Sequence, residues 1–147
     1  MLKISRKTDY ALYVLGLLSE QKGSVSLREL AKFGNLPYRF LSQIMGVLKS
    51  YGFVHSKEGV HGGYKLAKRP QDIRVTAVIE AFEGPMSVVS CFLEADCHSA
   101  EHCPSQSLWS VIQSHLAQVL DSYTLADLIQ KNPDSKSGAF STMLSHA

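Results

Sequence analysis

The feature that most constrains the fold is segment 26–52, which is typical of two short helices joined by a tight turn. Ser26 stands three residues before Glu29, so their side chains can cap each other's backbone amides at the start of a helix. Gly34 and Asn35 favour the left-handed conformation that ends a helix. The sequence therefore predicts a short helix, a turn and a second helix, which is the order of a helix-turn-helix motif.

The second helix is predicted over residues 37–50. Pro37 suits the first helical position, because its missing amide hydrogen is not needed there, and Gly52 suits the left-handed residue after the end. The opposite, polar face contains Arg39 and Gln43, whose forked donors match guanine and adenine edges in the major groove. Apolar side chains at helical spacing predict a buried face: Leu41, Ile44, Met45 and Leu48.

Two β-prone runs follow at residues 53–56 and 64–66, joined by a loop that contains Gly62 and Gly63. They predict a β-hairpin, and a hairpin directly after a helix-turn-helix is a wing. The predicted fold is thus mainly α with a small β wing: a winged helix-turn-helix domain plus a long C-terminal dimerisation helix. The candidate DNA-contacting residues are Arg28, Tyr38, Arg39, Ser42, Gln43, Lys49, Lys57 and His61.

Charge is distributed unevenly along the 147 residues, although the net charge is only +2. Residues 1–74 hold 13 of the 15 Lys and Arg against five of the 13 Asp and Glu, a net charge of +8, whereas residues 75–147 carry −6. An asymmetry of this size predicts a polyanion-binding surface on the first half. Double-stranded DNA is the predicted partner.

The chain is predicted to divide into a DNA-binding domain (1–74), a region with the cysteines and a long helix (75–130), and a Ser-rich disordered tail (131–147). An apolar stripe predicts a core helix from about residue 8 to 19. The longest apolar run, 11–18, is shorter than the roughly 20 residues of a bilayer span, and no signal-peptide pattern follows it. No membrane association and a cytoplasmic location are expected.

Three cysteines, Cys91, Cys97 and Cys103, lie in the irregular segment 86–104 with five residues in each gap. Six-residue steps suit neither one helix face nor one strand face, so the thiols can converge only if the loop wraps around a bound centre. Their odd number argues against a secreted disulfide framework. Thiolate ligands favour zinc or iron–sulfur chemistry.

Helical periodicity resumes after Pro104 and predicts a helix of about 20 residues, roughly 30 Å long, that reaches Tyr123. Thr76 is the predicted cap of a shorter helix before the cysteines, and residues 124–127 resemble a capping box that starts a final helix. One small domain has too little core to cover the long helix, which therefore predicts a homodimer. Two recognition helices related by symmetry would bind a near-palindromic operator.

Four sequence motifs, in order, resemble the winged-helix transcription factors typified by IscR and NsrR. They are KTDYAL at 7–12, LSQI at 41–44, GVHGGYKL at 59–66 and the evenly spaced cysteines. The resemblance covers about residues 1–130. It implies a homodimer in which a 2Fe–2S or 4Fe–4S cluster is held by Cys91, Cys97 and Cys103, and in which loss, oxidation or nitrosylation of the cluster alters DNA binding.

The fourth cluster ligand differs among the proteins that the chain resembles. IscR-like proteins use a histidine three residues after the last cysteine, but Gln106 occupies that position here. NsrR-like proteins use an aspartate near the start of the first helix of the other subunit, and Asp9 matches that place. The resemblance therefore favours Asp9, with His102 and His98 as alternatives.

The wing departs from its relatives at one position. Many carry arginine just before the first wing glycine, where it can enter the minor groove, whereas this chain carries Glu58. A carboxylate there would repel phosphates, so minor-groove reading falls to Lys57 or His61, or is lost.

The sequence thus predicts a homodimeric DNA-binding regulator, mainly a repressor, that senses nitric oxide or iron–sulfur or redox status through its cluster. The alternative is a zinc-binding or thiol-redox-switch regulator of the same fold without a cluster. An enzyme is not expected, because the sequence has no paired base and nucleophile at motif spacing, phosphate loop or HExxH motif.

Overall fold

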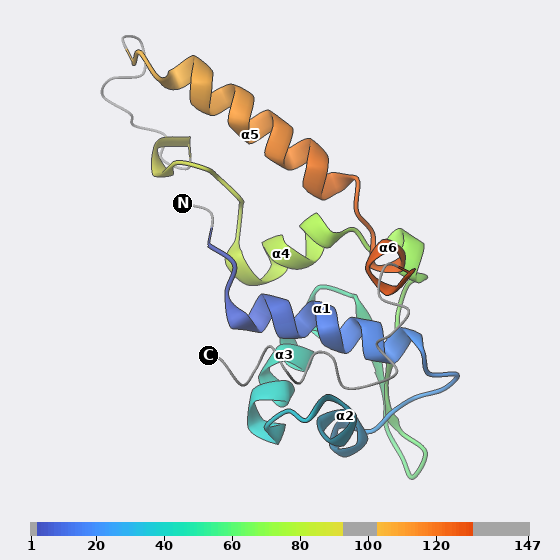
Figure 1. The fold of residues 1–147 in the computed structure, drawn as a ribbon. Coiled ribbons are helices and arrows are strands. Elements are labelled where there is room, and N and C mark those ends of the chain that lie inside the picture. The colour runs from blue at the N-terminus through green and yellow to red at the C-terminus, as the bar shows by residue number, and fades with distance from the viewer. Residues whose placement is uncertain (1–2, 93–102, 131–147) are drawn as a thin grey trace.

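The computed structural model describes residues 3–92 and 103–130. It is mainly helical with one two-stranded antiparallel sheet, which confirms the predicted fold class (Figure 1). Cys97, His98, His102 and the tail 131–147 lie outside the described residues. In chain order the elements are α1 (Arg6–Ser19), α2 (Leu27–Gly34), α3 (Tyr38–Ser50), β1 (Val54–Lys57), β2 (Gly63–Leu66), η1 (Pro70–Asp72), α4 (Val75–Glu83), η2 (Ser90–Phe92), α5 (Gln106–Asp121) and α6 (Leu125–Gln130).

Helix α1 is the centre of the core, in contact with α2 and α3 on one side and with α4 and α6 on the other (Figure 1). It begins at Arg6, earlier than the predicted start near Thr8, because Ser5 is the cap and its hydroxyl accepts the Thr8 amide at 3.5 Å. Of the predicted apolar stripe, Val14, Leu15 and Leu18 are buried in this core, whereas Leu12 and Leu17 are partly buried against it.

The helix-turn-helix forms with the predicted caps at α2. The Ser26 hydroxyl accepts the Glu29 amide at 3.2 Å, and the Glu29 carboxylate accepts the Ser26 amide at 2.9 Å. Asn35 ends α2 in the left-handed conformation, with φ of 49°. Pro37 precedes α3 as its cap residue, so the prediction that it occupies the first helical position is wrong by one residue. Its backbone is extended, with ψ of 127°, and helical geometry starts only at Tyr38.

Helix α3 has the two faces that its periodicity predicts. Its apolar face packs inward, and Ser42, Gln43, Gly46 and Lys49 are exposed on the opposite side. The fully buried residues are Leu41, Ile44, Met45 and Leu48.

The wing consists of the antiparallel strands β1 and β2. Strand β1 starts one residue later than predicted, and β2 starts one residue earlier than predicted. Val25 and Tyr64 exchange backbone hydrogen bonds of 2.9 and 2.8 Å, which ties β2 to the residue before the cap of α2. Gly63 has φ of 147°, and a Cβ there would lie 2.4 Å from the Val25 carbonyl. Only glycine fits this close approach, which fixes the wing relative to the helix-turn-helix.

Helix α4 does not use Thr76 as its cap, which corrects the prediction. The helix begins at Val75, and the buried Thr76 hydroxyl has no hydrogen-bond partner among the described residues. The Val75 amide instead donates to the Tyr123 carbonyl at 3.0 Å, and the Leu125 amide donates to the Ile73 carbonyl at 2.8 Å. Backbone pairing replaces the side-chain cap and brings α6 to the core around α1, where Leu125 is buried.

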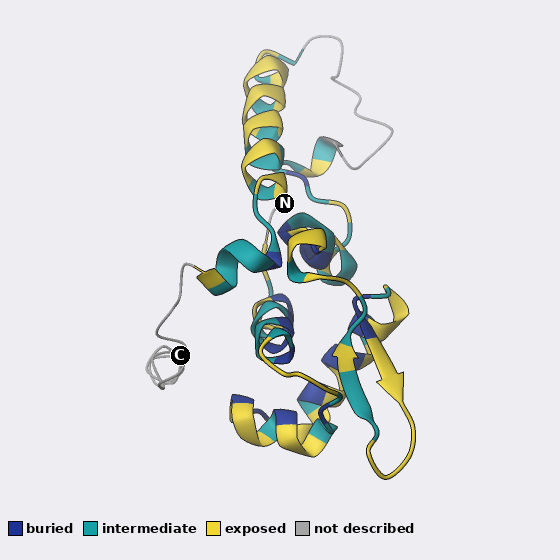
Figure 2. Ribbon diagram, turned by 90° about the vertical axis from the view of Figure 1, so that its right-hand side faces the viewer, coloured by how far each residue is buried: buried dark blue, intermediate teal, exposed yellow. Residues whose placement is uncertain are grey.

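Helix α5 has 16 residues and ends at Asp121, so it is shorter than the predicted helix that reaches Tyr123. The predicted start of the final helix is confirmed, because the Asp127 carboxylate accepts the Thr124 amide at 2.8 Å and the Thr124 hydroxyl at 2.7 Å. None of the described residues of α5 is buried, and the helix projects from the body (Figure 2). The large exposed apolar side chains of α5 are Leu108, Val111, Ile112 and Val119.

No helix in the described part of the chain combines the length and the apolar character that a bilayer crossing requires.

Candidate DNA-binding surface and metal-binding loop

Helices α2 and α3 and the wing gather at one end of the molecule, and α5 lies at the opposite end (Figures 1 and 2). All of the predicted DNA-contacting side chains come from these three elements or the wing loop, and all are exposed. The fold therefore brings together residues that are up to 33 positions apart in the sequence. They are Arg28 of α2, Tyr38, Arg39, Ser42, Gln43 and Lys49 of α3, and Lys57 and His61 of the wing.

The outer face of α3 is shaped for reading base edges. Arg39 and Gln43 are four residues apart and therefore lie one above the other on the same side of the helix. Their forked donors and acceptors point away from the buried face. Tyr38, 54% exposed, opens the first turn. A helix held by its apolar face and carrying such side chains outward can lie in a major groove.

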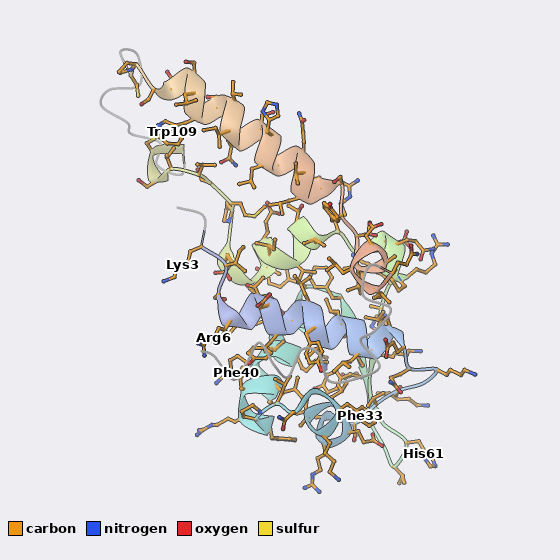
Figure 3. The ribbon with its side chains drawn as sticks, in the orientation of Figure 1. Lys3, Arg6, Phe33, Phe40, His61 and Trp109 are labelled. Carbon is orange, nitrogen blue, oxygen red and sulfur yellow. The ribbon has the colours of Figure 1, made fainter. Side chains whose placement is uncertain are left out.

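The wing tip carries His61, which lies at the far end of the hairpin (Figure 3). Its neighbour Val60, 98% exposed, is an apolar side chain that the prediction missed. Groove-binding proteins use such apolar side chains as wedges in the minor groove. The sequence signal was available, because a valine inside a Gly-rich hairpin loop has no core to enter. Glu58 and Lys57 are exposed beside it.

Two of the three predicted cysteine ligands are described, and they flank residues 93–102. Cys91 lies in η2 and Cys103 precedes α5, and both thiols are free and half-buried. Hydrogen bonds from Ser105, first from its hydroxyl and then from its backbone amide, lower the pKa of Cys103. A lower thiol pKa favours the thiolate, which is the form that binds metals. This donor chemistry fits a zinc or iron–sulfur centre.

Asp9, the favoured fourth ligand, is exposed on the first turn of α1. Within the described part of one chain, no three His, Cys, Asp or Glu side chains lie close enough together to hold a metal ion. A carboxylate contributed by the partner subunit would not need to lie beside the cysteines of its own chain. Asp9 therefore stays a prediction.

Glu83 holds the turn that carries Asp9, and the sequence did not reveal this role. It is the last residue of α4, and its carboxylate accepts the Ser5 amide at 2.8 Å and the Thr8 hydroxyl. The hydrogen bonds from Ser5 and then Thr8 lower the pKa of Glu83. They join the start of α1 to the point where the chain leaves α4 toward Cys91.

Gln113 of α5 is a second residue that the prediction missed. Its side-chain oxygen accepts the Val88 amide at 2.8 Å, and its side-chain nitrogen donates to the Met86 carbonyl at 3.0 Å. The partners are 25 and 27 residues away, so no local pattern could indicate the contact. The segment that leads to Cys91 is thereby attached to α5.

Fold and surface together define a winged helix-turn-helix DNA-binding regulator. The family model of Rrf2, described as an iron-dependent transcriptional regulator, matches residues 4–131. The chain belongs to the Rrf2 family of transcriptional regulators, which agrees with the expectation that it is not an enzyme.

Individual relatives bear out the resemblance to IscR and NsrR and add a third kind of regulator. The solved structure of CymR, the global cysteine regulator of B. subtilis, is 35% identical, covers 89% of this chain and 98% of its own, and has a TM-score of 0.72. The solved structure of T. potens IscR is 32% identical, covers 93% of each chain and has a TM-score of 0.70. The regulator NsrR of Geobacillus kaustophilus is 32% identical over 92% of this chain and 95% of its own.

Proposed function

We propose that the chain forms a homodimer that binds a near-palindromic operator, acts mainly as a repressor, and changes its operator affinity with the state of an iron–sulfur cluster. The observation that carries the proposal is the pair of free, half-buried thiols of Cys91 and Cys103 at the two ends of the segment that contains Cys97. The family is described as an iron-dependent transcriptional regulator, and its members IscR and NsrR are those whose resemblance to this chain implies a cluster, which supports the same cofactor here.

The ligands would be Cys91, Cys97, Cys103 and Asp9 of the partner subunit. When bound, a cluster of this kind supplies a centre that reacts with nitric oxide and oxidants. The hydrogen bonds from Ser105 hold Cys103 toward its thiolate form. A carboxylate ligand would be more easily displaced than a fourth thiolate, which suits a sensor.

Dimer formation is supported by the exposed face of α5. Its apolar side chains recur at positions 108, 111, 112 and 119, a spacing that places them on one side of a helix. An isolated chain would leave this stripe in water, and a second copy would cover it. Two copies of α3 would then face two half-sites.

The path from the cysteines to the DNA runs through contacts that the chain already makes. Glu83 attaches the end of α4 to the first turn of α1, and α1 packs directly on α2 and α3. A movement of Cys91 would be passed to α4 and from there to α1, and a movement of Asp9 would act directly on the first turn of α1. Either one would alter the spacing of the two α3 helices.

The alternative, a zinc-binding or thiol-switch regulator without a cluster, is favoured by one observation. The fold is shared by CymR, described as the global cysteine regulator of B. subtilis, and CymR of Staphylococcus aureus has been solved in an oxidized form. A cysteine with a lowered pKa such as Cys103 also suits a thiol switch.

Anaerobic purification followed by iron, sulfide and zinc analysis and a visible spectrum separates the two proposals. A brown protein with iron and acid-labile sulfide supports the cluster, whereas a colourless protein with stoichiometric zinc supports the alternative. Cys97→Ala and Asp9→Ala should lower the iron content. Glu80→Ala, which removes an exposed carboxylate of α4, is the matched control and should leave the iron content unchanged.

A further inference from the structure

We propose that Gln113 is a positioning residue, which fixes the arm that carries Cys91 against the helix that follows Cys103. The inference rests on the proposed function, because it concerns how the cysteines are prepared for a metal centre. It adds a residue of α5 that touches neither the thiols nor the DNA-binding surface.

The amide of Gln113 uses both of its ends on one short stretch of backbone. It accepts the Val88 amide at 2.8 Å and donates to the Met86 carbonyl at 3.0 Å, and both contacts are partly buried. A side-chain amide that pairs with a backbone donor and acceptor two residues apart replaces the pairing that a neighbouring strand would give. The stretch therefore has a defined place on α5 without secondary structure of its own.

The residue between these two contacts makes a further hydrogen bond within the segment. Ser87 is only 3% exposed, and its hydroxyl donates to the Val89 carbonyl at 2.7 Å. The segment 86–89 is thus held internally by the Ser87 hydrogen bond and attached to α5 by the amide of Gln113.

The attachment limits how far the two described thiols can separate. Cys91 follows Val88 by three residues, which span at most about 10 Å. On the other side, Gln113 lies seven residues into α5 from Gln106, about 10 Å along the helix axis. Cys103 is three residues before that helix start. Cys91 is therefore held within about 10 Å of Val88, and Cys103 within about 20 Å of Gln113, which sets an upper bound on the separation of the two thiols.

Tethering matters because ordering a chain around a metal costs conformational entropy. Between the end of α4 and the start of α5, a contact that fixes residues 86–89 in advance shortens the stretch that remains to be ordered. Residues that hold metal ligands in place typically change metal affinity by 10–100-fold when they are replaced. The expected effect of losing the Gln113 amide is at the lower end, about tenfold.

The test compares Gln113→Leu with Gln118→Leu. Both substitutions remove an amide from α5, but the side chain of Gln118 donates only to Ser114 of its own helix, at 3.4 Å. One readout is the hydrogen-exchange rate of the Val88 amide in metal-free protein. The other is the rate at which anaerobically purified protein releases iron to a chelator, followed by its visible absorption, in samples of equal oligomeric state.

The proposal predicts that Gln113→Leu speeds Val88 exchange and also speeds iron release, the latter by about tenfold, while Gln118→Leu matches the wild type. Unchanged Val88 exchange in Gln113→Leu, or faster exchange with wild-type iron release, would overturn the role of Gln113 and leave the proposed function intact. A wild-type protein that holds no iron contradicts the proposed function, and with it the role given to Gln113.

Discussion

At the DNA-binding end, α3 buries four apolar side chains completely, and α2 starts with a reciprocal side-chain cap. At the opposite end, none of the described residues of α5 is buried, and no side chain caps the start of the helix. The first end obtains its stability from contacts within one chain. The second carries an exposed apolar stripe and two free, half-buried thiols. The difference teaches that the DNA-binding end is stabilised within a single subunit, whereas the α5 end would be completed by the proposed partner subunit and bound centre.

The largest expected effect comes from the same substitution made at the two ends. Leu41→Ala removes a fully buried side chain of α3 and should lower the free energy of unfolding by about 2–5 kcal/mol. Leu108→Ala on α5, where the side chain is 55% exposed, should cost one chain well under about 1 kcal/mol and instead weaken the dimer. Denaturant unfolding at two protein concentrations measures both effects. If both substitutions lowered the free energy of unfolding equally, and by the same amount at both protein concentrations, the contrast between the two ends would be refuted.

The next effect concerns operator binding. Arg39→Ala and Gln43→Ala should each weaken binding by about 1–3 kcal/mol at fixed salt, because each removes a forked donor from the outer face of α3. Arg74→Ala is the matched control for charge, since Arg74 is exposed before α4 and outside this surface. Titrations of labelled operator give the affinities. If Arg74→Ala weakened binding as much as Arg39→Ala, binding would reflect overall charge and not a reading surface.

The helix caps provide a smaller comparison. Ser26→Ala removes the hydroxyl that accepts the Glu29 amide, while the backbone amide of residue 26 can still donate to the Glu29 carboxylate, and should lower the free energy of unfolding by about 1 kcal/mol. Ser105 occupies the same position before α5 but makes no capping hydrogen bond, so Ser105→Ala should cost much less. Thermal unfolding of the two metal-free variants checks this. Similar losses would mean that the two ends are stabilised alike.

The smallest effect is the pH dependence of the Glu83 contact. Because the folded pKa is lowered below the ordinary value of 4.5, the contact contributes its full stability above that pH and loses it as the pH falls through the folded pKa. Glu83 is exposed, so solvent screening keeps this contribution below about 1 kcal/mol. Unfolding curves of the wild type and Glu83→Gln should converge on acidification. A constant difference down to pH 2 would contradict the contact.

The helix-turn-helix and the wing could be predicted because their signals are local. Ser26 and Glu29 lie within one helical turn, and the apolar period of α3 directly gives its buried face. The contacts of Glu83 and Gln113 could not be predicted, since their partners are more than 20 residues away and any exposed Glu or Gln would look the same in the sequence. The start of α4 was misplaced because backbone pairing with Tyr123 replaced the cap expected at Thr76.

The candidate metal site was predictable only in part. The spacing of the cysteines indicates a bound centre, and the structure supplies the surroundings of Cys91 and Cys103. The hydrogen bond from Ser105 that favours the Cys103 thiolate depends on the turn before α5, which sequence periodicity does not specify.

The central claim is that a centre held by the cysteines controls the operator affinity of the dimer. The most direct test measures operator binding anaerobically, at one salt concentration, for the same preparation before and after the metal is removed with a chelator. The account predicts that the two affinities differ by about fivefold or more. Equal affinities for the loaded and the stripped dimer would contradict it.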